Sequence, residues 1–138
     1  MVIDILLISV LLAAFISQSI KISIFFFRHK LKINWSDVVA TGGFPSTHTA
    51  LVTSLMASIF LEQRFSALFA VSFVIFTIVL TDSLGVRRTV GEEADALNKF
   101  AKKSKIKIFH TSHGHTPKEV LAGIIIGAII SVLVFYLI

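Results

Sequence analysis

Residues 41–50 have the sequence Thr-Gly-Gly-Phe-Pro-Ser-Thr-His-Thr-Ala and lead directly into an apolar run. The two glycines permit backbone conformations that other residues avoid, and Pro45 fixes φ where a helix begins. Ser46 or Thr47 can accept hydrogen bonds from the first free N–H groups of that helix. The pattern therefore predicts a helix that begins at Ser46 or Thr47, with His48 in its first turn. Such a turn favours an anion, and a histidine there exchanges protons near neutral pH; the alternative is a histidine that only meets lipid headgroups.

The composition is that of an integral membrane protein. Of the 138 residues, 55% are hydrophobic, which exceeds the share in an ordinary soluble protein, and the length fits a single domain. The formal net charge of +5 lies in the segments between the apolar runs, which favours anionic lipid headgroups or an anionic substrate as partners. The sequence has no pattern typical of nucleic-acid binding. It has no cysteine either, which excludes disulfide and thiolate chemistry.

Four apolar runs have the length and composition of membrane-spanning helices. They cover residues 3–20, 46–61, 65–82 and 117–138. The tight link at 62–64 predicts that the second and third spans form an antiparallel hairpin, and Gly123 and Gly127 predict a packing face on the last span. Apolar residues recur on one helical face over 90–103, which predicts an amphipathic helix at the membrane surface. The expected fold is an all-α, polytopic membrane helix bundle.

The number of spans determines which polar residues can meet. With four spans, the two long loops lie on one side of the membrane, and the short turn and both termini lie on the other. The long loops hold nearly all lysines and arginines, so the positive-inside rule places them in the cytoplasm and both termini outside the plasma membrane. Ionisable groups at the membrane edge are functional candidates. This topology brings the following residues to one membrane face: Gln18, Lys21, His48, Asp82, Arg87, Arg88, His115 and Glu119.

His115 and Glu119 are spaced by four residues at the start of the last span. The functional interpretation is that Glu119 accepts a hydrogen bond from one imidazole nitrogen and leaves the other nitrogen free to attack an electrophile. The alternative is that Glu119 only completes a capping box with Thr116 and has no catalytic role.

Arg87 and Arg88 follow the third span closely. Their planar, forked cations suit phosphate oxygens, and Asp82 is near enough in the sequence to hold one of them. Lys21 can supply a point charge to the same phosphate. The alternatives are ordinary positive-inside anchoring for the arginines and a snorkelling position beside Gln18 for the lysine.

Three ordered segments resemble a known superfamily. Residues 45–48 resemble the Pro-Ser-x-His motif of the type 2 phosphatidic acid phosphatase and vanadium-dependent haloperoxidase superfamily. His115 and Glu119 resemble its closing His-x-x-x-Asp motif, with glutamate in place of aspartate. The segments GGFPSTH at 42–48, DSLGVRR at 82–88 and GHTPKEV at 114–120 together resemble the divergent, small membrane branch of that superfamily.

This resemblance implies hydrolysis of a phosphate monoester through a phosphohistidine. In that scheme His115 attacks phosphorus, His48 protonates the leaving oxygen, and cations stabilise the charge on the equatorial oxygens without a metal or another cofactor. The implied substrate is a lipid phosphate, because the helix ends place the site at headgroup depth. The substrate-binding residues expected from the resemblance and the spacing are Lys21, Ser46, Thr47, Asp82, Arg87 and Arg88.

Two departures from the superfamily pattern keep other functions open. Arg28 lacks the proline that follows the corresponding arginine, and Phe109-His110 stands where the superfamily has Ser-Arg. A membrane module that binds phosphate or lipid headgroups without turnover, or a small transporter, is therefore an alternative hypothesis. Because four short spans enclose little space, a homodimer is a further hypothesis.

A metal site is the third hypothesis. His110, His113 and His115, with Glu119, Asp82 or Glu92, have the ligand types of a Zn²⁺ site. Their spacing in a glycine-containing loop is loose, so the phosphatase hypothesis, which needs no metal, is preferred.

Overall fold

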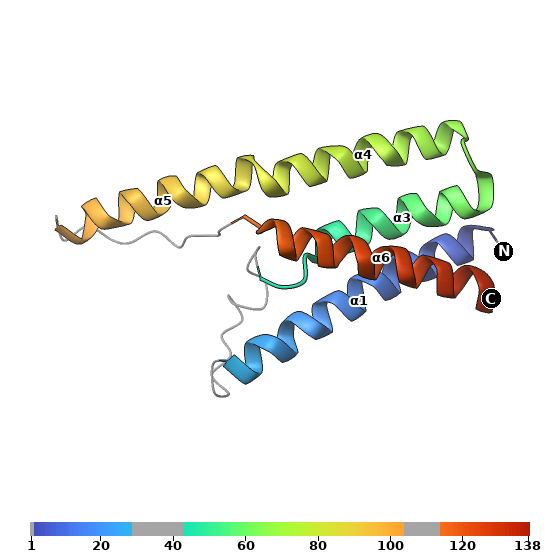
Figure 1. The fold of residues 1–138 in the computed structure, drawn as a ribbon, viewed down its shortest axis with the longest axis horizontal. Helices are drawn as coiled ribbons and strands as arrows, with labels where there is room; N and C mark the ends of the chain where they lie inside the picture. The colour runs from blue at the N-terminus through green and yellow to red at the C-terminus, as the bar shows by residue number, and fades with distance from the viewer. Residues whose placement is uncertain (1, 29–42, 104–113) are drawn as a thin grey trace.

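The described part of the chain is a bundle of α-helices (Figure 1). The computed structural model describes residues 2–28, 43–103 and 114–138. These residues contain no β-strand, which confirms the expected all-α membrane bundle. The helices are α1 (Val2–Arg28), α3 (Thr47–Gln63), α4 (Ala67–Leu84), α5 (Val86–Lys103) and α6 (Pro117–Leu137).

The central helix of the bundle is α3, which packs against α1, α4 and α6. It has 17 residues and is shorter than the three helical stretches that are long and apolar enough to cross a membrane, so the described part contains three such stretches where the sequence predicted four. Because its neighbours enclose α3, its buried residues can be small and polar, as Thr49, Ser54 and Ser58 are. The apolar character that marks a membrane-spanning helix in the sequence is therefore weaker in α3 than in its neighbours.

Close contact between α3 and α6 depends on Gly123 and Gly127. A Cβ atom at Gly123 would lie 2.5 Å from the carbonyl oxygen of Ser46, and one at Gly127 would overlap the carbonyl oxygen of Ala50. One turn further on, the Ser131 hydroxyl lies 3.0 Å from the carbonyl oxygen of Ser54. The two glycines therefore form a packing face inside the bundle, as the sequence predicted.

The first helix is longer than the expected span. It runs to Arg28, so residues 22–27 continue it, and its stretch suited to the membrane is Ile5–Phe27. Lys21 is the one charged residue within that stretch. The helix therefore carries its lysine on a rigid element rather than on a loop.

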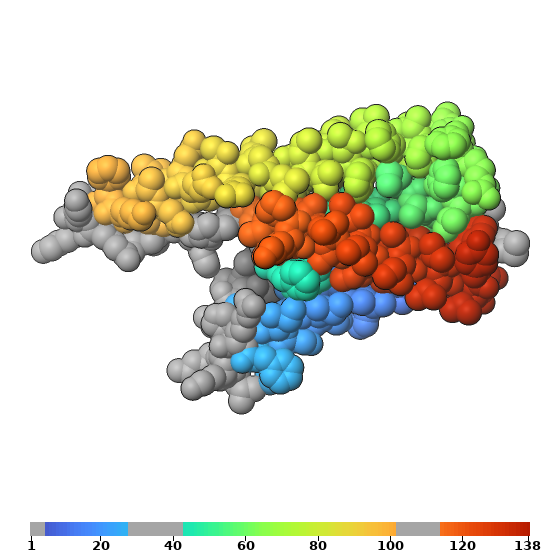
Figure 2. Space-filling model, viewed as in Figure 1, coloured from blue at the N-terminus to red at the C-terminus, as the bar shows by residue number. Residues whose placement is uncertain are grey.

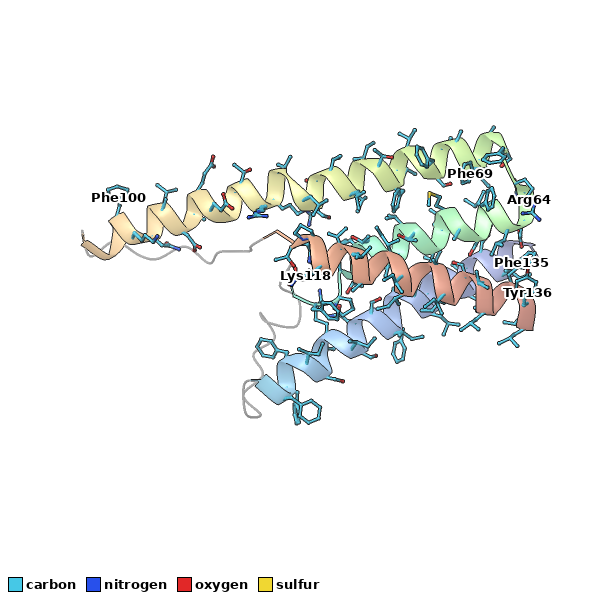
Figure 3. The ribbon with its side chains drawn as sticks, viewed as in Figure 1. Arg64, Phe69, Phe100, Lys118, Phe135 and Tyr136 are labelled. Atoms are coloured by element: carbon cyan, nitrogen blue, oxygen red, sulfur yellow. The ribbon has the colours of Figure 1, made fainter. Side chains whose placement is uncertain are left out.

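α5 continues almost along the axis of α4 and projects past the rest of the bundle (Figures 1 and 2). It begins at Val86, four residues before the predicted start, and only Gly85 separates it from α4. The run Ala67–Ala101 has 35 residues, which at 1.5 Å per residue is about 52 Å and exceeds the ~30 Å of hydrocarbon in a bilayer. α5 is amphipathic as predicted, with Val86, Val90, Leu97 and Phe100 exposed along it. Figure 3 shows Phe100 pointing away from the bundle.

The helix ends divide into two groups at opposite ends of the bundle. Both termini lie together at one end, near the turn between α3 and α4 (Figure 1). Arg64, Phe69, Phe135 and Tyr136 also lie at that end (Figure 3), and aromatic side chains of this kind are common at a membrane interface. The start of α3, the end of α4 and the start of α6 lie toward the other end, where the predicted site residues are.

Candidate active site

His115 lies just before α6 and contacts residues of both α4 and α6. Its side chain is 3% exposed, and its backbone N–H donates to the carbonyl oxygen of Ser83 at 3.2 Å. Nδ1 lies 3.3 Å from Oε2 of Glu119. Nε2 is buried and has no hydrogen-bond partner in the described part of the chain. A carboxylate thus orients one nitrogen, and the lone pair of the other is not used within the described structure.

Glu119 contacts both partners that the sequence offered it, the His115 imidazole and the start of α6. The same oxygen that faces His115 accepts a hydrogen bond from the backbone N–H of Thr116 at 2.9 Å, and the Thr116 hydroxyl accepts from the Glu119 N–H at 3.4 Å. This is the predicted capping box. The cap holds the Glu119 carboxylate on the first turn of α6. The start of the helix therefore determines where this carboxylate lies relative to His115.

The start of α3 is tied to α6 and α1. Ser46 is fully buried and caps α3, since its hydroxyl accepts from the Thr49 N–H at 3.4 Å. Its own backbone N–H donates to the carbonyl oxygen of Glu119 at 3.0 Å. Thr47 donates to Oε1 of Gln18 at 3.1 Å. Ser46 and Thr47 thus hold the helix start in place, while the side chain of His48 is exposed beside them.

Charged side chains surround the two histidines. Lys21 and Glu119 both lie within electrostatic range of His115, and Lys21, Asp82 and Arg87 lie within range of His48. Gly43 has a φ of +86°, and a Cβ atom there would lie 3.9 Å from the Lys21 side chain.

The two arginines have different partners. Nε of Arg87 donates to Oδ2 of Asp82, which holds the guanidinium beside the end of α4 and near His48. Nε of Arg88 donates to Glu92 at 3.1 Å along an exposed face of α5. Arg87 therefore lies with the charged groups around His48, and Arg88 is paired one turn along its own helix.

A glycine brings the arginines to the histidine loop. A Cβ atom at Gly114 would lie 2.5 Å from the backbone nitrogen of Arg88 and 2.8 Å from the carbonyl carbon of Arg87. With the hydrogen bond from His115 to Ser83, this contact docks the junction of α4 and α5 onto the loop before α6. Neither the contact of Ser83 nor that of Gly114 was predicted from the sequence, because both join distant segments. In the sequence, the feature that could have indicated this close contact is Gly114, directly before His115.

Burial determines the protonation of His115. It lowers the pKa of the imidazole below its ordinary value of 6.5, the hydrogen bond to Glu119 raises it, and the charge of Lys21 lowers it. The pKa remains below 6.5 when these effects are combined. The imidazole is therefore neutral at pH 7, which is the state in which a nitrogen lone pair can attack.

The metal hypothesis depends on residues that are only partly described. Among residues 2–28, 43–103 and 114–138, no three histidines or carboxylates are grouped as metal ligands. His110 and His113, together with the segment Phe109-His110 that departs from the superfamily pattern, lie outside the described residues.

Comparison with known proteins matches these segments to a family. Residues 3–130 match the Divergent PAP2 family. The chain belongs to this family. The matched range includes all three segments that resemble the superfamily, namely residues 42–48, 82–88 and 114–120.

A curated relative of this Divergent PAP2 family chain is also a membrane protein. It is the "Uncharacterized membrane protein YuiD" of Bacillus subtilis (strain 168), which is 36% identical over 148 aligned positions. The alignment covers 94% of this chain and 93% of the relative. No solved structure matches the chain. Membership and the relative support a PAP2-related membrane protein.

Proposed function

We propose that the chain is a membrane phosphatase that hydrolyses a lipid phosphate monoester through a phosphohistidine on His115. The observation that carries the proposal is the His115 imidazole, with Nδ1 facing the Glu119 carboxylate and Nε2 without a hydrogen-bond partner among the described residues. A buried nitrogen without a partner costs free energy, so its retention needs a reason. Attack on phosphorus is such a reason, because it uses that lone pair.

The proposed reaction has two displacement steps. In the first, Nε2 of His115 forms a bond to phosphorus, the P–O bond to the lipid breaks, and His48 gives its proton to the leaving oxygen. In the second, water attacks the phosphohistidine, His48 takes a proton from the water, and inorganic phosphate leaves as the N–P bond breaks. Side chains that cover Nε2 must move aside when substrate binds, because that atom is buried.

Two cations support the substrate in this proposal. Arg87 and Lys21 both lie within electrostatic range of His48, and such cations stabilise negative charge that develops on the phosphoryl oxygens. Asp82 acts through Arg87 by holding its guanidinium. The lipid class follows from the position of the site near helix ends, where the headgroup of a membrane lipid lies.

The test is release of phosphate from a short-chain lipid phosphate by purified protein in detergent. Wild-type protein releases phosphate, and His115→Ala reduces release by at least ~10³-fold, because a nucleophile has no substitute in this scheme. Lys118→Ala is the matched control: Lys118 lies exposed on the first turn of α6 (Figure 3) and has no part in the proposed steps. Release that persists in His115→Ala rejects the proposal.

A phosphate-binding module without turnover is the second candidate. The burial of Nε2 favours it, since that atom is closed to a ligand in the described conformation. It predicts binding of a phosphate lipid by both wild-type and His115→Ala protein, with no phosphate released from any member of a broad substrate panel.

A further inference from the structure

We infer that Gly114 is a positioning residue that sets Arg87 against the nucleophile loop, so that one backbone contact fixes the distance between His115 and the phosphate-binding arginine. This inference rests on the proposed phosphatase function. Gly114 itself has no side chain to touch substrate. Its effect passes through Arg87.

The contact leaves no room for a side chain. A Cβ atom at Gly114 would lie 2.5 Å from the Arg88 nitrogen, and 2.8 Å from the Arg87 carbonyl carbon and from the Arg88 Cα. All three neighbours are backbone atoms, so rotation of a side chain cannot relieve the overlap. An alanine at this position must therefore push the first turn of α5 away from the loop.

The contact acts together with a second one on the next residue. His115 donates its backbone N–H to the carbonyl oxygen of Ser83, which is 2% exposed and lies two residues before Gly85. The loop therefore holds α4 on one side of the Gly85 break and α5 on the other. Asp82 and Arg87 form their ion pair across the same break. Displacement of α5 moves Arg87 relative to both Asp82 and His115.

The experiment is a double-mutant cycle on kcat/KM for a short-chain lipid phosphate and on inhibition by vanadate. We expect Gly114→Ala to reduce kcat/KM about tenfold and to weaken vanadate inhibition by a similar factor, within the range of coupling for residues in contact. In the Arg87→Ala background, the same change is expected to have no further effect. Equal losses in the two backgrounds would overturn the inference.

Gly127→Ala is the matched control. Its Cβ also overlaps backbone, at the carbonyl oxygen of Ala50 in the packing of α3 and α6, far along the bundle from the loop. It should lower the melting temperature, and its effect on kcat/KM should be the same in the wild-type and Arg87→Ala backgrounds. If the loss of kcat/KM caused by Gly127→Ala also disappeared in the Arg87→Ala background, general loss of packing would explain the result for Gly114→Ala.

Gly85→Ala keeps the inference testable if Gly114→Ala does not fold. Its Cβ would lie 3.0 Å from the carbonyl oxygen of Thr81, a milder overlap that disturbs the same junction from the α4 side. We expect a smaller loss of kcat/KM that also disappears with Arg87→Ala, and a loss that adds to that of Arg87→Ala contradicts the inference. Wild-type protein without phosphatase activity would instead reject the proposed function. Direct binding of vanadate, titrated without substrate, then still tests the positioning role, because Gly114→Ala is expected to weaken that binding only when Arg87 is present.

Discussion

At the scale of single residues, Glu119 makes two separate contacts through one oxygen atom. Its Oε2 accepts from the Thr116 N–H and faces Nδ1 of His115. The sequence allowed both roles because the spacing of a capping box and the spacing of a histidine with its carboxylate coincide at a helix start. The sequence could not show that Glu119 makes both contacts at once, because this depends on the rotamer of its side chain.

Glu119→Gln separates the two roles. Glutamine can still complete the capping box, but it lacks the negative charge and the acceptor strength that raise the pKa of His115. We expect turnover to fall by about 10²–10⁴-fold, as when an orienting carboxylate is lost from a triad. We also expect the acid limb of the kcat/KM profile to move to lower pH, because the imidazole then stays neutral to lower pH.

Thr116→Ala is the control for this prediction. It removes the hydroxyl side of the cap, which costs about 0.5–2 kcal/mol of stability, and leaves the carboxylate beside the imidazole. Its acid limb should match that of wild type. An acid limb that moves to higher pH in Glu119→Gln would contradict the role assigned to the carboxylate.

Arg87 and Arg88 offer a second comparison at this scale. The sequence did not distinguish them, because both follow the same helix end. In the structure, Arg87 lies near His48 and pairs with Asp82, whereas Arg88 pairs with Glu92 on α5. We expect Arg87→Ala to reduce kcat/KM by roughly 10²–10³-fold, as loss of a transition-state donor does, and Arg88→Ala to reduce it less than about threefold. Steady-state kinetics of the two variants measure the difference, and equal losses would reject the assignment.

At the scale of elements, the sequence predicted most helices because apolar runs and caps are local signals. The starts of α3 and α6 follow from Ser46 and Thr116, which both cap as expected. The end of α1 and the start of α5 were predicted less accurately. The predicted first span ends at residue 20, whereas α1 continues to Arg28. The predicted amphipathic helix begins at 90, whereas α5 begins at Val86, because Gly85 alone interrupts the helical run.

α5 supplies the prediction at this scale. Leu97 is exposed on its apolar face, and Lys99, two residues on, lies about 200° around the helix. Because the chain has no cysteine, Leu97→Cys and Lys99→Cys can each carry one environment-sensitive fluorophore. In vesicles that contain anionic lipid, we expect emission typical of an apolar environment at position 97 and of water at position 99, since an amphipathic helix buries its apolar face at the interface. Emission typical of water at both positions would contradict contact of this helix with the membrane.

At the scale of the whole molecule, α3 organises the bundle and brings the three family segments together. Residues 43–48 lead into it, and the segments at 82–88 and 114–120 meet beside its start through Gly114 and through the hydrogen bond from Ser46 to Glu119. The sequence predicted that these segments share one membrane face, because alternate helix ends do. The contacts between them involve backbone atoms far apart in the chain, and no local pattern encodes such contacts.

The sidedness of the bundle can be measured from its two ends. The positive-inside rule predicts that the site faces the cytoplasm and that the turn between α3 and α4 faces outward. In cells, Gln63→Cys should react with a membrane-impermeant maleimide, and Lys118→Cys should react only after the membrane is opened. Both positions are exposed. Labelling of position 118 but not of position 63 in intact cells would indicate the opposite orientation.

The central claim is that His115 becomes phosphorylated during turnover. His48→Ala protein is mixed with p-nitrophenyl phosphate, whose leaving group needs no proton, so that the first step proceeds while the second lacks its base. We expect a phosphoryl group on His115 that is stable in alkali and labile in acid and that mass spectrometry maps to that residue. Protein that carries both His115→Ala and His48→Ala should lack it. Release of p-nitrophenol without any phosphoryl group on His115, or the same phosphorylation in the doubly substituted protein, would contradict this claim.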